Sequence, residues 1–268
     1  MRRERWPAGL LVGLTLSAGC SREPPFVRDD GGWRYEGLRI DVDSASFRPL
    51  GRHYGVDARQ AIHADTFRES SDYFTTRRLR VTVVKGADLA SFQVLDDDHA
   101  RDRGHVYHEG RPLAVKDVAS FELLEHGFAR DRIAGYYQQT LVPGSDGRSF
   151  QAAGHHLAKD AMRVWWCDIG IGEGGAPSPR RCQVLAGAAP QGFEVLERRY
   201  SRSGDRIYHQ DRVVEGADAA RFVAGHGFEG DIDAQDASSA YRDGRRVGPA
   251  ALGAPASAAV GMGQNPGR

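Results

Sequence analysis

Histidines and aspartates are the residues of this chain that first suggest metal chemistry. His155 and His156 are adjacent, with Asp160 close behind, and imidazole with carboxylate is a common zinc ligand set. Neighbouring side chains of a strand point to opposite faces, so the two imidazoles are poorly placed to hold one ion. The Asp96-Asp97-Asp98 run offers oxygen ligands but lacks the glycine and distal glutamate of a calcium loop. We therefore expect no metal site.

A glycine pattern also invites a functional interpretation. Gly170, Gly172 and Gly175 have the spacing of a dinucleotide-binding loop, which requires a strand before it and a helix after it. Pro177 and Pro179 are incompatible with that helix. Serine, cysteine and carboxylate side chains also lack partners at a recognisable catalytic spacing. We expect no cofactor and no catalytic residues.

Two pairs of adjacent aromatic residues are the stronger candidates for binding. They are Tyr136-Tyr137 and Trp165-Trp166. In a strand, one ring of each pair should face the core and the other should face outward. The outward rings, assigned to Tyr137 and Trp166, could stack on sugar rings or on peptide. The alternative is that these rings cover a sheet edge or pack at an interface.

The elements that would position these rings follow from a repeat. Several phenylalanines are 29 residues apart, and most of them have an aspartate four residues before, an aspartate ten after and an aromatic residue fifteen after. Such a period is typical of a repeat protein. The phenylalanines are Phe47, Phe92, Phe121, Phe150, Phe193 and Phe222. Trp33, fourteen residues before Phe47, indicates a partial unit ahead of the first full one.

Each unit predicts the same local structure. Asp117 should cap a short helical turn with its carboxylate, and Phe121-Glu-Leu-Leu should form a strand. Residues 106–108 and 111–113 should pair as a hairpin, with Gly110 in the turn. One unit buries too little apolar surface to fold alone, so neighbouring units must share a core. The fold class is mainly β: tandem repeats of about 29 residues, each a strand plus a β-hairpin with short helical turns, stacked as an array.

This unit, with GAD-x-x-SF-x-VL, then ARD, then VY-x-x-G-x-x-L, resembles the DKNYY family of bacterial repeat proteins. The resemblance runs from about Trp33 to Val247. The Asp-Lys-Asn-Tyr core that names the family is reduced here to an aspartate and an aromatic residue, as in Asp102…Tyr107. The resemblance implies a repeat fold and, since many members are lipoproteins, a membrane anchor. It implies no biochemical activity.

The N-terminus has the features of a bacterial export signal. Arg2, Arg3 and Arg5 precede a short apolar run that ends in small residues, as a cleavable signal requires. Cys20 follows directly, and Leu16-Ser-Ala-Gly-Cys20 resembles a lipobox. We expect lipidation of Cys20, with an ordinary cleaved signal as the alternative. Ser21 resembles the outer-membrane sorting pattern, so the predicted location is the outer membrane, facing the periplasm or the cell surface.

The two remaining cysteines are Cys167 and Cys182, in the long fourth unit. In an oxidising compartment they should form a disulfide that closes an inserted loop. The rival interpretation is a pair of metal ligands, for which the sequence offers no further ligand at a suitable spacing.

The predicted organisation has four parts. Residues 1–19 form the signal peptide and 20–30 a tether. Residues 31–247 form the repeat domain, with the insertion at 167–182, and 248–268 a disordered tail. Within the repeats, residues 59–67 read as a short helix and 77–85 as a strand.

Charge and composition narrow the function. The formal net charge is zero, which gives no long-range attraction to nucleic acid. Our first hypothesis is a non-enzymatic, envelope-anchored repeat protein that binds a protein or a glycan through an extended surface. A second is an envelope hydrolase with a site assembled across units, and a third is a spacer without a dedicated ligand.

Overall fold

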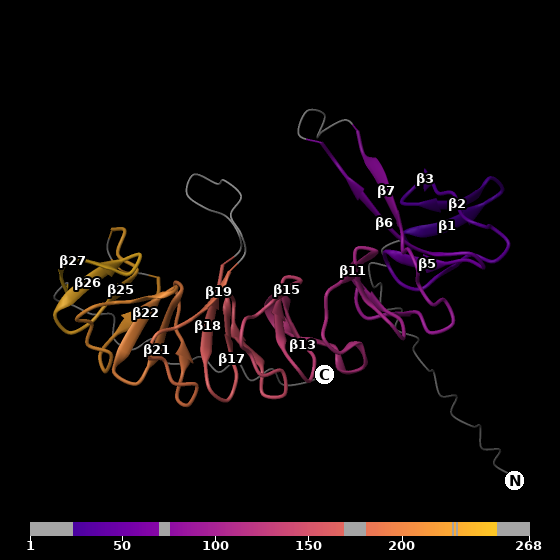
Figure 1. The fold of residues 1–268 in the computed structure, drawn as a ribbon. Coiled ribbons are helices and arrows are strands. Elements are labelled where there is room, and N and C mark those ends of the chain that lie inside the picture. Colours follow the sequence, from indigo (N-terminus) through magenta and orange to yellow (C-terminus); the bar gives the residue numbers. More distant parts are fainter. Residues whose placement is uncertain (1–23, 70–75, 169–180, 227, 229, 251–268) are drawn as a thin grey trace, which may run out of the picture.

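The structure, a computed structural model, describes residues 24–69, 76–168, 181–226, 228 and 230–250. These residues form seven small antiparallel sheets that follow one another as a row (Figure 1). We number the sheets 1 to 7 in chain order. Within the described residues no helix is long and apolar enough to cross a membrane. The mainly β repeat array expected from the sequence is confirmed.

The first four sheets contain the N-terminal half of the array. Sheet 1 has three strands, β1 (Phe26–Asp29), β2 (Gly32–Tyr35) and β3 (Leu38–Arg39). Sheet 2 has β4 (Arg48–Pro49), β5 (Tyr54–Val56), β6 (Ala61–Phe67) and β7 (Arg78–Val83). Sheet 3 has β8 (Gln93–Val94), β9 (His99–Arg101), β10 (Val106–His108) and β11 (Arg111–Leu113). Sheet 4 has β12 (Glu122–Leu123), β13 (Phe128–Arg130), β14 (Gly135–Tyr137) and β15 (Thr140–Leu141), and two 3-10 helices flank β12, η1 (Val118–Ser120) and η2 (Glu125–Gly127).

The last three sheets repeat the four-stranded plan. Sheet 5 has β16 (Gln151–Gly154), β17 (Leu157–Lys159), β18 (Val164–Cys167) and β19 (Cys182–Val184). Sheet 6 has β20 (Glu194–Val195), β21 (Tyr200–Ser203), β22 (Arg206–His209) and β23 (Arg212–Val213). Sheet 7 has β24 (Val223–Ala224), β25 (Ala234–Gln235), β26 (Ser239–Arg242) and β27 (Arg245–Pro249).

Every four-stranded sheet is a meander in which consecutive strands pair. We call its strands first to fourth in chain order, and β1 to β3 of sheet 1 correspond to the second to fourth. The hairpin predicted in sheet 3 is confirmed, with Val106 opposite Leu113 and His108 opposite Arg111. Its turn favours glycine at position 110 for two reasons: the φ there is +76°, and a Cβ atom would lie 2.9 Å from Thr82 on the neighbouring sheet.

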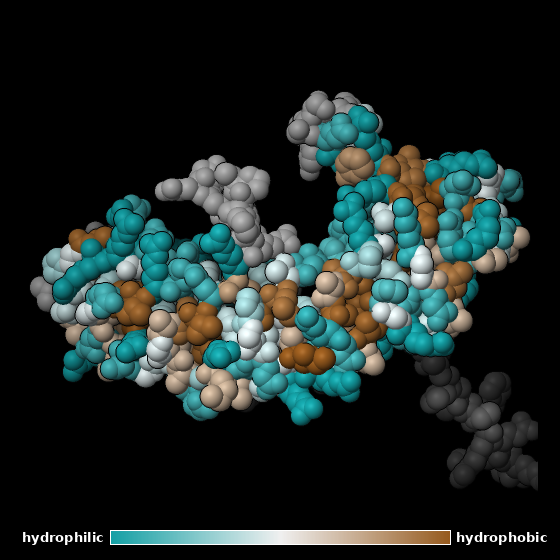
Figure 2. All heavy atoms as spheres, viewed as in Figure 1, coloured by the Kyte–Doolittle hydropathy of each residue, from teal (hydrophilic) through white to brown (hydrophobic). Residues whose placement is uncertain are grey.

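The core is divided into six parts, one between each pair of successive sheets. Each part contains one repeat phenylalanine, which is at most 9% exposed. They are Phe47, Phe92, Phe121, Phe150, Phe193 and Phe222, in the order of the interfaces. Figure 2 shows hydrophobic side chains gathered in separate groups along the row. The equivalence of these phenylalanines, on which the predicted repeat depends, is therefore confirmed.

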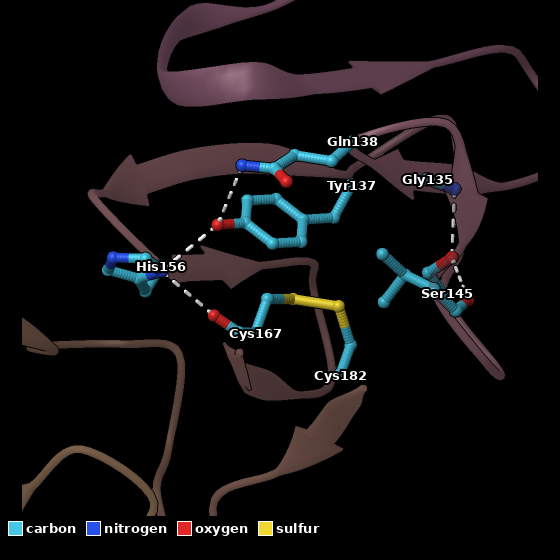
Figure 3. Close-up of a disulfide and its surroundings, with 8 residues drawn as sticks. Gly135, Tyr137, Gln138, Ser145, His156, Cys167 and Cys182 are labelled. Carbon is cyan, nitrogen blue, oxygen red and sulfur yellow. Dashed lines mark hydrogen bonds between the residues drawn. A yellow bond between two sulfur atoms is a disulfide. The ribbon is translucent and has the colours of Figure 1, made fainter. Parts of the chain in front are cut away.

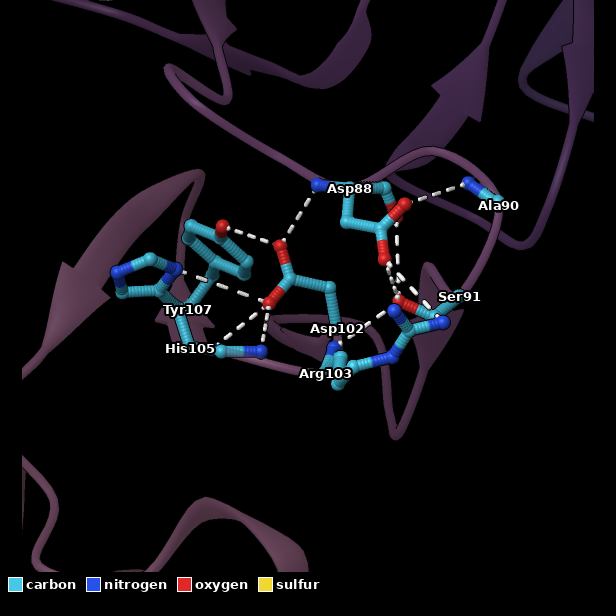
Figure 4. A network of polar contacts seen from close by, with 8 residues as sticks. Asp88, Ala90, Ser91, Asp102, Arg103, His105 and Tyr107 are labelled. Carbon is cyan, nitrogen blue, oxygen red and sulfur yellow. Dashed lines mark hydrogen bonds and ion pairs between the residues drawn. The ribbon is translucent and has the colours of Figure 1, made fainter.

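In five of the seven sheets, a buried aspartate lies in the turn between the second and third strands. The Asp102 Oδ1 atom accepts the N–H of Gly104 and of His105, both at 2.7 Å. Its Oδ2 accepts the N–H of Asp88 at 2.9 Å and the hydroxyl of Tyr107 at 2.7 Å (Figure 4). The carboxylate thus ties the turn to the segment that precedes the first strand.

The same arrangement recurs along the array. Asp131 and Asp236 accept equivalent hydrogen bonds from backbone and tyrosine. Asp57 and Asp160 accept the backbone hydrogen bonds alone, since Ile62 and Trp165 stand where the tyrosine would be.

Three local predictions were wrong. Residues 61–67 form β6, not a helix, because they pair along their length with β7. Residues 26–29 of the predicted tether form β1 and pair with β2. A 3-10 turn does follow Asp117, but its carboxylate makes no cap hydrogen bond; it accepts the Ser120 hydroxyl at 2.6 Å.

Candidate functional site

The two aromatic residues predicted to face outward are buried. Tyr137 is 2% exposed and Trp166 is 7% exposed. Adjacent rings do point to opposite faces, as expected: Tyr136 packs between sheets 3 and 4, and Tyr137 between sheets 4 and 5. The prediction was wrong because both faces of an inner sheet are covered by its neighbours. No outward row of rings can therefore form from this pair.

Tyr137 instead belongs to a polar contact inside the array. The Nδ1 atom of His156 lies 3.0 Å from the Tyr137 hydroxyl oxygen and 3.0 Å from the Cys167 carbonyl oxygen (Figure 3). Gln138 also donates to the same hydroxyl at 3.4 Å. Burial lowers the pKa of His156, which favours the neutral imidazole at this interface. His155 lies apart, with its ring against that of His126.

The predicted disulfide between Cys167 and Cys182 is present. The two residues are directly opposite each other on β18 and β19, and the bond lies beside Tyr137 (Figure 3). It fastens the fourth strand of sheet 5 to the third. Residues 169–180 of the predicted insertion lie outside the described part of the chain. Cys20 lies outside it as well.

The turn aspartates are as buried as many catalytic carboxylates, but their oxygens already accept several hydrogen bonds. Burial alone would raise the pKa of Asp102, yet the hydrogen bonds from Tyr107 and from three backbone N–H groups lower it overall. The same balance lowers the pKa of Asp57, Asp131 and Asp236. A carboxylate held ionised by several donors is a weak base. We therefore assign these carboxylates to the stabilisation of the turns between the second and third strands.

Three side chains of metal-ligand type lie together near the C-terminal end of the array, where the sequence analysis predicts no site. Side-chain atoms of His209, Asp233 and Asp243 lie within 4.8 Å of one another. Asp233 is already engaged, since its Oδ1 accepts the Tyr200 hydroxyl and its Oδ2 accepts the Asp243 N–H, both at 2.8 Å. The hydrogen bond from Tyr200 to Asp233 joins sheets 6 and 7, so one carboxylate of the cluster already serves the packing of the last interface.

One cross-strand pair recurs in six of the sheets, formed by the first residue of the second strand and the residue opposite it on the third strand. Its members face the next sheet and lie seven and sixteen residues after the repeat phenylalanine. This spacing is present in the sequence and is the signal that could have indicated the pair. The pairs are Phe26–Tyr35, Tyr54–His63, His99–His108, Phe128–Tyr137, Leu157–Trp166 and Tyr200–His209. In sheet 3 both members are histidine, and there the interface has a hollow.

The hollow is a cavity of about 160 Å³ between sheets 3 and 4. Its walls are mostly apolar and include Leu113, Leu124, Phe128 and Tyr136. His99 borders the cavity, but its Nδ1 is drawn to the Asp96 carboxylate, 2.9 Å from Oδ1. The arrangement can hold a small apolar molecule against a polar end.

Fold and turns together define a class of protein: a row of small antiparallel sheets, most of them with a buried aspartate in the turn between the second and third strands, and with a shared core between neighbours. The family model of the DKNYY family matches residues 26–168, and the chain belongs to this family. The match covers sheets 1 to 4 and three strands of sheet 5. No curated protein and no solved structure matches the chain.

Proposed function

We propose that this chain is a non-enzymatic, envelope-anchored array that binds a protein partner along the fourth strands of its sheets. The observation that carries the proposal is a set of exposed aliphatic side chains on these strands. Val83 on β7 is 42% exposed, Val184 on β19 is 48% exposed and Val247 on β27 is 49% exposed. Val81 on β7 and Leu141 on β15 are exposed as well.

The fourth strands share a second property. Each is the outermost strand of its sheet, so in the described part of the chain one edge of its backbone pairs with no other strand. Because the sheets follow one another with the same strand order, these edges fall on the same side of the row. An open strand edge with exposed aliphatic side chains is suited to an extended segment of another protein, which adds as a further strand.

Tyr137 and Trp166 are buried, so the outward rings that were expected to stack on sugar rings or on peptide are absent. The proposal rests instead on the fourth strands, whose open edges suit an extended protein segment better than a glycan. Attachment to the membrane would come from Cys20, lipidated after removal of residues 1–19. That would place the array at the outer membrane, facing the periplasm or the cell surface. A formal net charge of zero favours protein over nucleic acid as the partner.

The test compares two surfaces of the full chain. Val83→Lys with Val184→Lys places charge on two fourth strands, where lysine discourages strand addition. Val195→Lys is the matched control, because Val195 is similarly exposed but lies on β20, at the opposite edge of its sheet. Capture from envelope extracts should recover a partner with the parent chain and the control. Equal recovery with the double variant would refute the proposed surface.

A separate assay addresses the enzyme alternative. The purified chain is incubated with peptidoglycan and with ester substrates, with and without a chelator. We expect no turnover. Any turnover would refute the non-enzymatic proposal, and turnover abolished by Asp233→Asn would assign it to the C-terminal cluster.

A further inference from the structure

The cavity between sheets 3 and 4 is explained by one replacement in the repeat. At the first residue of the second strand, other sheets carry Phe26, Tyr54, Phe128, Leu157 or Tyr200, each at most 4% exposed. Sheet 3 carries His99, which is only half-buried. Its imidazole lies against the Asp96 carboxylate and 4.8 Å from the ring centre of His108. The space that a buried ring, or the leucine of sheet 5, fills in these other sheets is open here.

The cavity has one polar end. His99 and Asp96 border it from sheet 3, and Gln138 and Gln139 border it from the turn between β14 and β15. If His99 Nδ1–H donates to Asp96, its Nε2 is the acceptor that remains for a ligand. The nearby carboxylate of Asp96 disfavours an anion. The remaining wall is aliphatic and aromatic.

Size and shape then limit the ligand. Apolar cavities of about 150 Å³ accept benzene in other proteins, and this one measures about 160 Å³. It stands where neighbouring sheets place a ring. We propose that the cavity between sheets 3 and 4 is a binding site for a small neutral aromatic molecule that carries one hydrogen-bond donor, with the donor directed to His99. Leu113 lies on a fourth strand, but none of the exposed side chains proposed as the fourth-strand surface borders the cavity, so each proposal can fail without the other.

The direct test uses phenol as the probe and the full chain with labelled leucine methyl groups. Phenol should shift the methyl resonances of Leu113 and Leu124, which line the cavity, and leave those of Leu50 in the core between sheets 2 and 3 unchanged. Benzoate, with the same ring but a negative charge, should bind at least tenfold more weakly. Absence of the shifts, or equal shifts at Leu50, would overturn the site. Equal affinity for benzoate would overturn the ligand class.

A substitution provides the second test. His99→Phe restores the ring that other sheets carry, so it should weaken phenol binding at least tenfold and leave the array folded. His105→Phe is the matched control, because His105 is exposed in the turn between β9 and β10 and does not border the cavity. If His99→Phe does not fold, Ala114→Leu at the exposed rim replaces it. Unchanged binding in the cavity variant would refute the proposal.

Discussion

The substitution Asp131→Asn tests the idea that buried carboxylates hold the repeats together. Asp131 is 1% exposed. Its Oδ1 accepts the N–H of Ile133 at 2.7 Å and of Ala134 at 2.8 Å. Its Oδ2 accepts the N–H of Asp117 at 2.8 Å, the N–H of Lys116 at 3.0 Å and the Tyr136 hydroxyl at 2.6 Å. An asparagine side chain can keep the first pair but presents an NH2 group to the second set.

The magnitude follows from which donors find another partner. The Tyr136 hydroxyl can turn to accept from the new amide, and it already accepts the Lys116 N–H at 2.7 Å. The Asp117 N–H is left without a partner, which costs about 1–3 kcal/mol when a buried donor is involved. The lost hydrogen bonds to a charged acceptor contribute roughly 1.5–3 kcal/mol each. We expect a loss of roughly 3–5 kcal/mol in the free energy of unfolding, within the range for a broken buried network.

Urea unfolding of the parent and variant measures this loss. Asp205→Asn, the same chemical change at an exposed residue of sheet 6, should change the free energy of unfolding by less than about 0.5 kcal/mol. Amide hydrogen exchange should also accelerate at Asp117 in the Asp131 variant. A loss below about 1 kcal/mol would mean that packing between the sheets, and not the carboxylate, holds the turn.

Three further predictions concern acid, the disulfide and the buried rings. Burial would raise the pKa of Asp236, but hydrogen bonds from Tyr241 and from backbone N–H groups outweigh it and lower the pKa to about 2. Because the pKa is lower in the folded state, the ionised carboxylate stabilises the fold above about pH 4. About 2 kcal/mol of the free energy of unfolding should therefore be lost as the pH falls from 4 to 2. Acid titration of stability should show a shallower loss in Asp236→Asn. Replacing both Cys167 and Cys182 by serine should lower the free energy of unfolding by about 3 kcal/mol, as the closed loop predicts, and a reducing agent should then have no further effect in urea titration. Tyr137→Ala should cost about 3–5 kcal/mol by leaving a cavity, whereas Met162→Ala, at a residue 77% exposed, should leave the thermal midpoint almost unchanged.

The repeat itself could be predicted from the sequence because the spacings that recur along the chain have local physical causes. The phenylalanine marks the core between two sheets, and the aspartate ten residues later marks the turn that closes it. The hairpin of residues 106–113 was predictable for the same reason, since Glu109-Gly110 matches a two-residue turn with positive φ at both positions.

What failed depended on the direction in which units stack. A period of 29 residues indicates that units recur, but it does not say whether sheets extend edge to edge or stack face to face. Face-to-face stacking buries both sides of each inner sheet, so Tyr137 has no outward side. The strand at residues 61–67 was missed because its partner, β7, begins eleven residues further on, beyond the reach of a local pattern.

The candidate site was hidden for a related reason. His99 and His108 are unremarkable alone, and their meaning appears only when their cross-strand pair is compared with the equivalent pair of other sheets. The comparison needs the register of every sheet. Once the register is known, the nine-residue spacing of each pair can be read directly from the sequence.

The exceptional unit gives the clearest reason to treat the two repeat aspartates as partners. In the Phe193 unit, Ala189 stands where other units have the aspartate four residues before the phenylalanine, and Ser203 stands where they have the aspartate ten residues after it. The Ser203 hydroxyl accepts the N–H of Ala189 at 2.9 Å and donates to its carbonyl at 3.2 Å. The Tyr208 hydroxyl, without a carboxylate to reach, donates to the Ala186 carbonyl at 3.0 Å. The serine hydroxyl keeps the hydrogen bonds to the backbone but does not bind the tyrosine. In the other units, the turn aspartate therefore holds the backbone and the tyrosine hydroxyl through one charged group. Where the aspartate is absent, the tyrosine hydroxyl takes a backbone carbonyl as its partner instead.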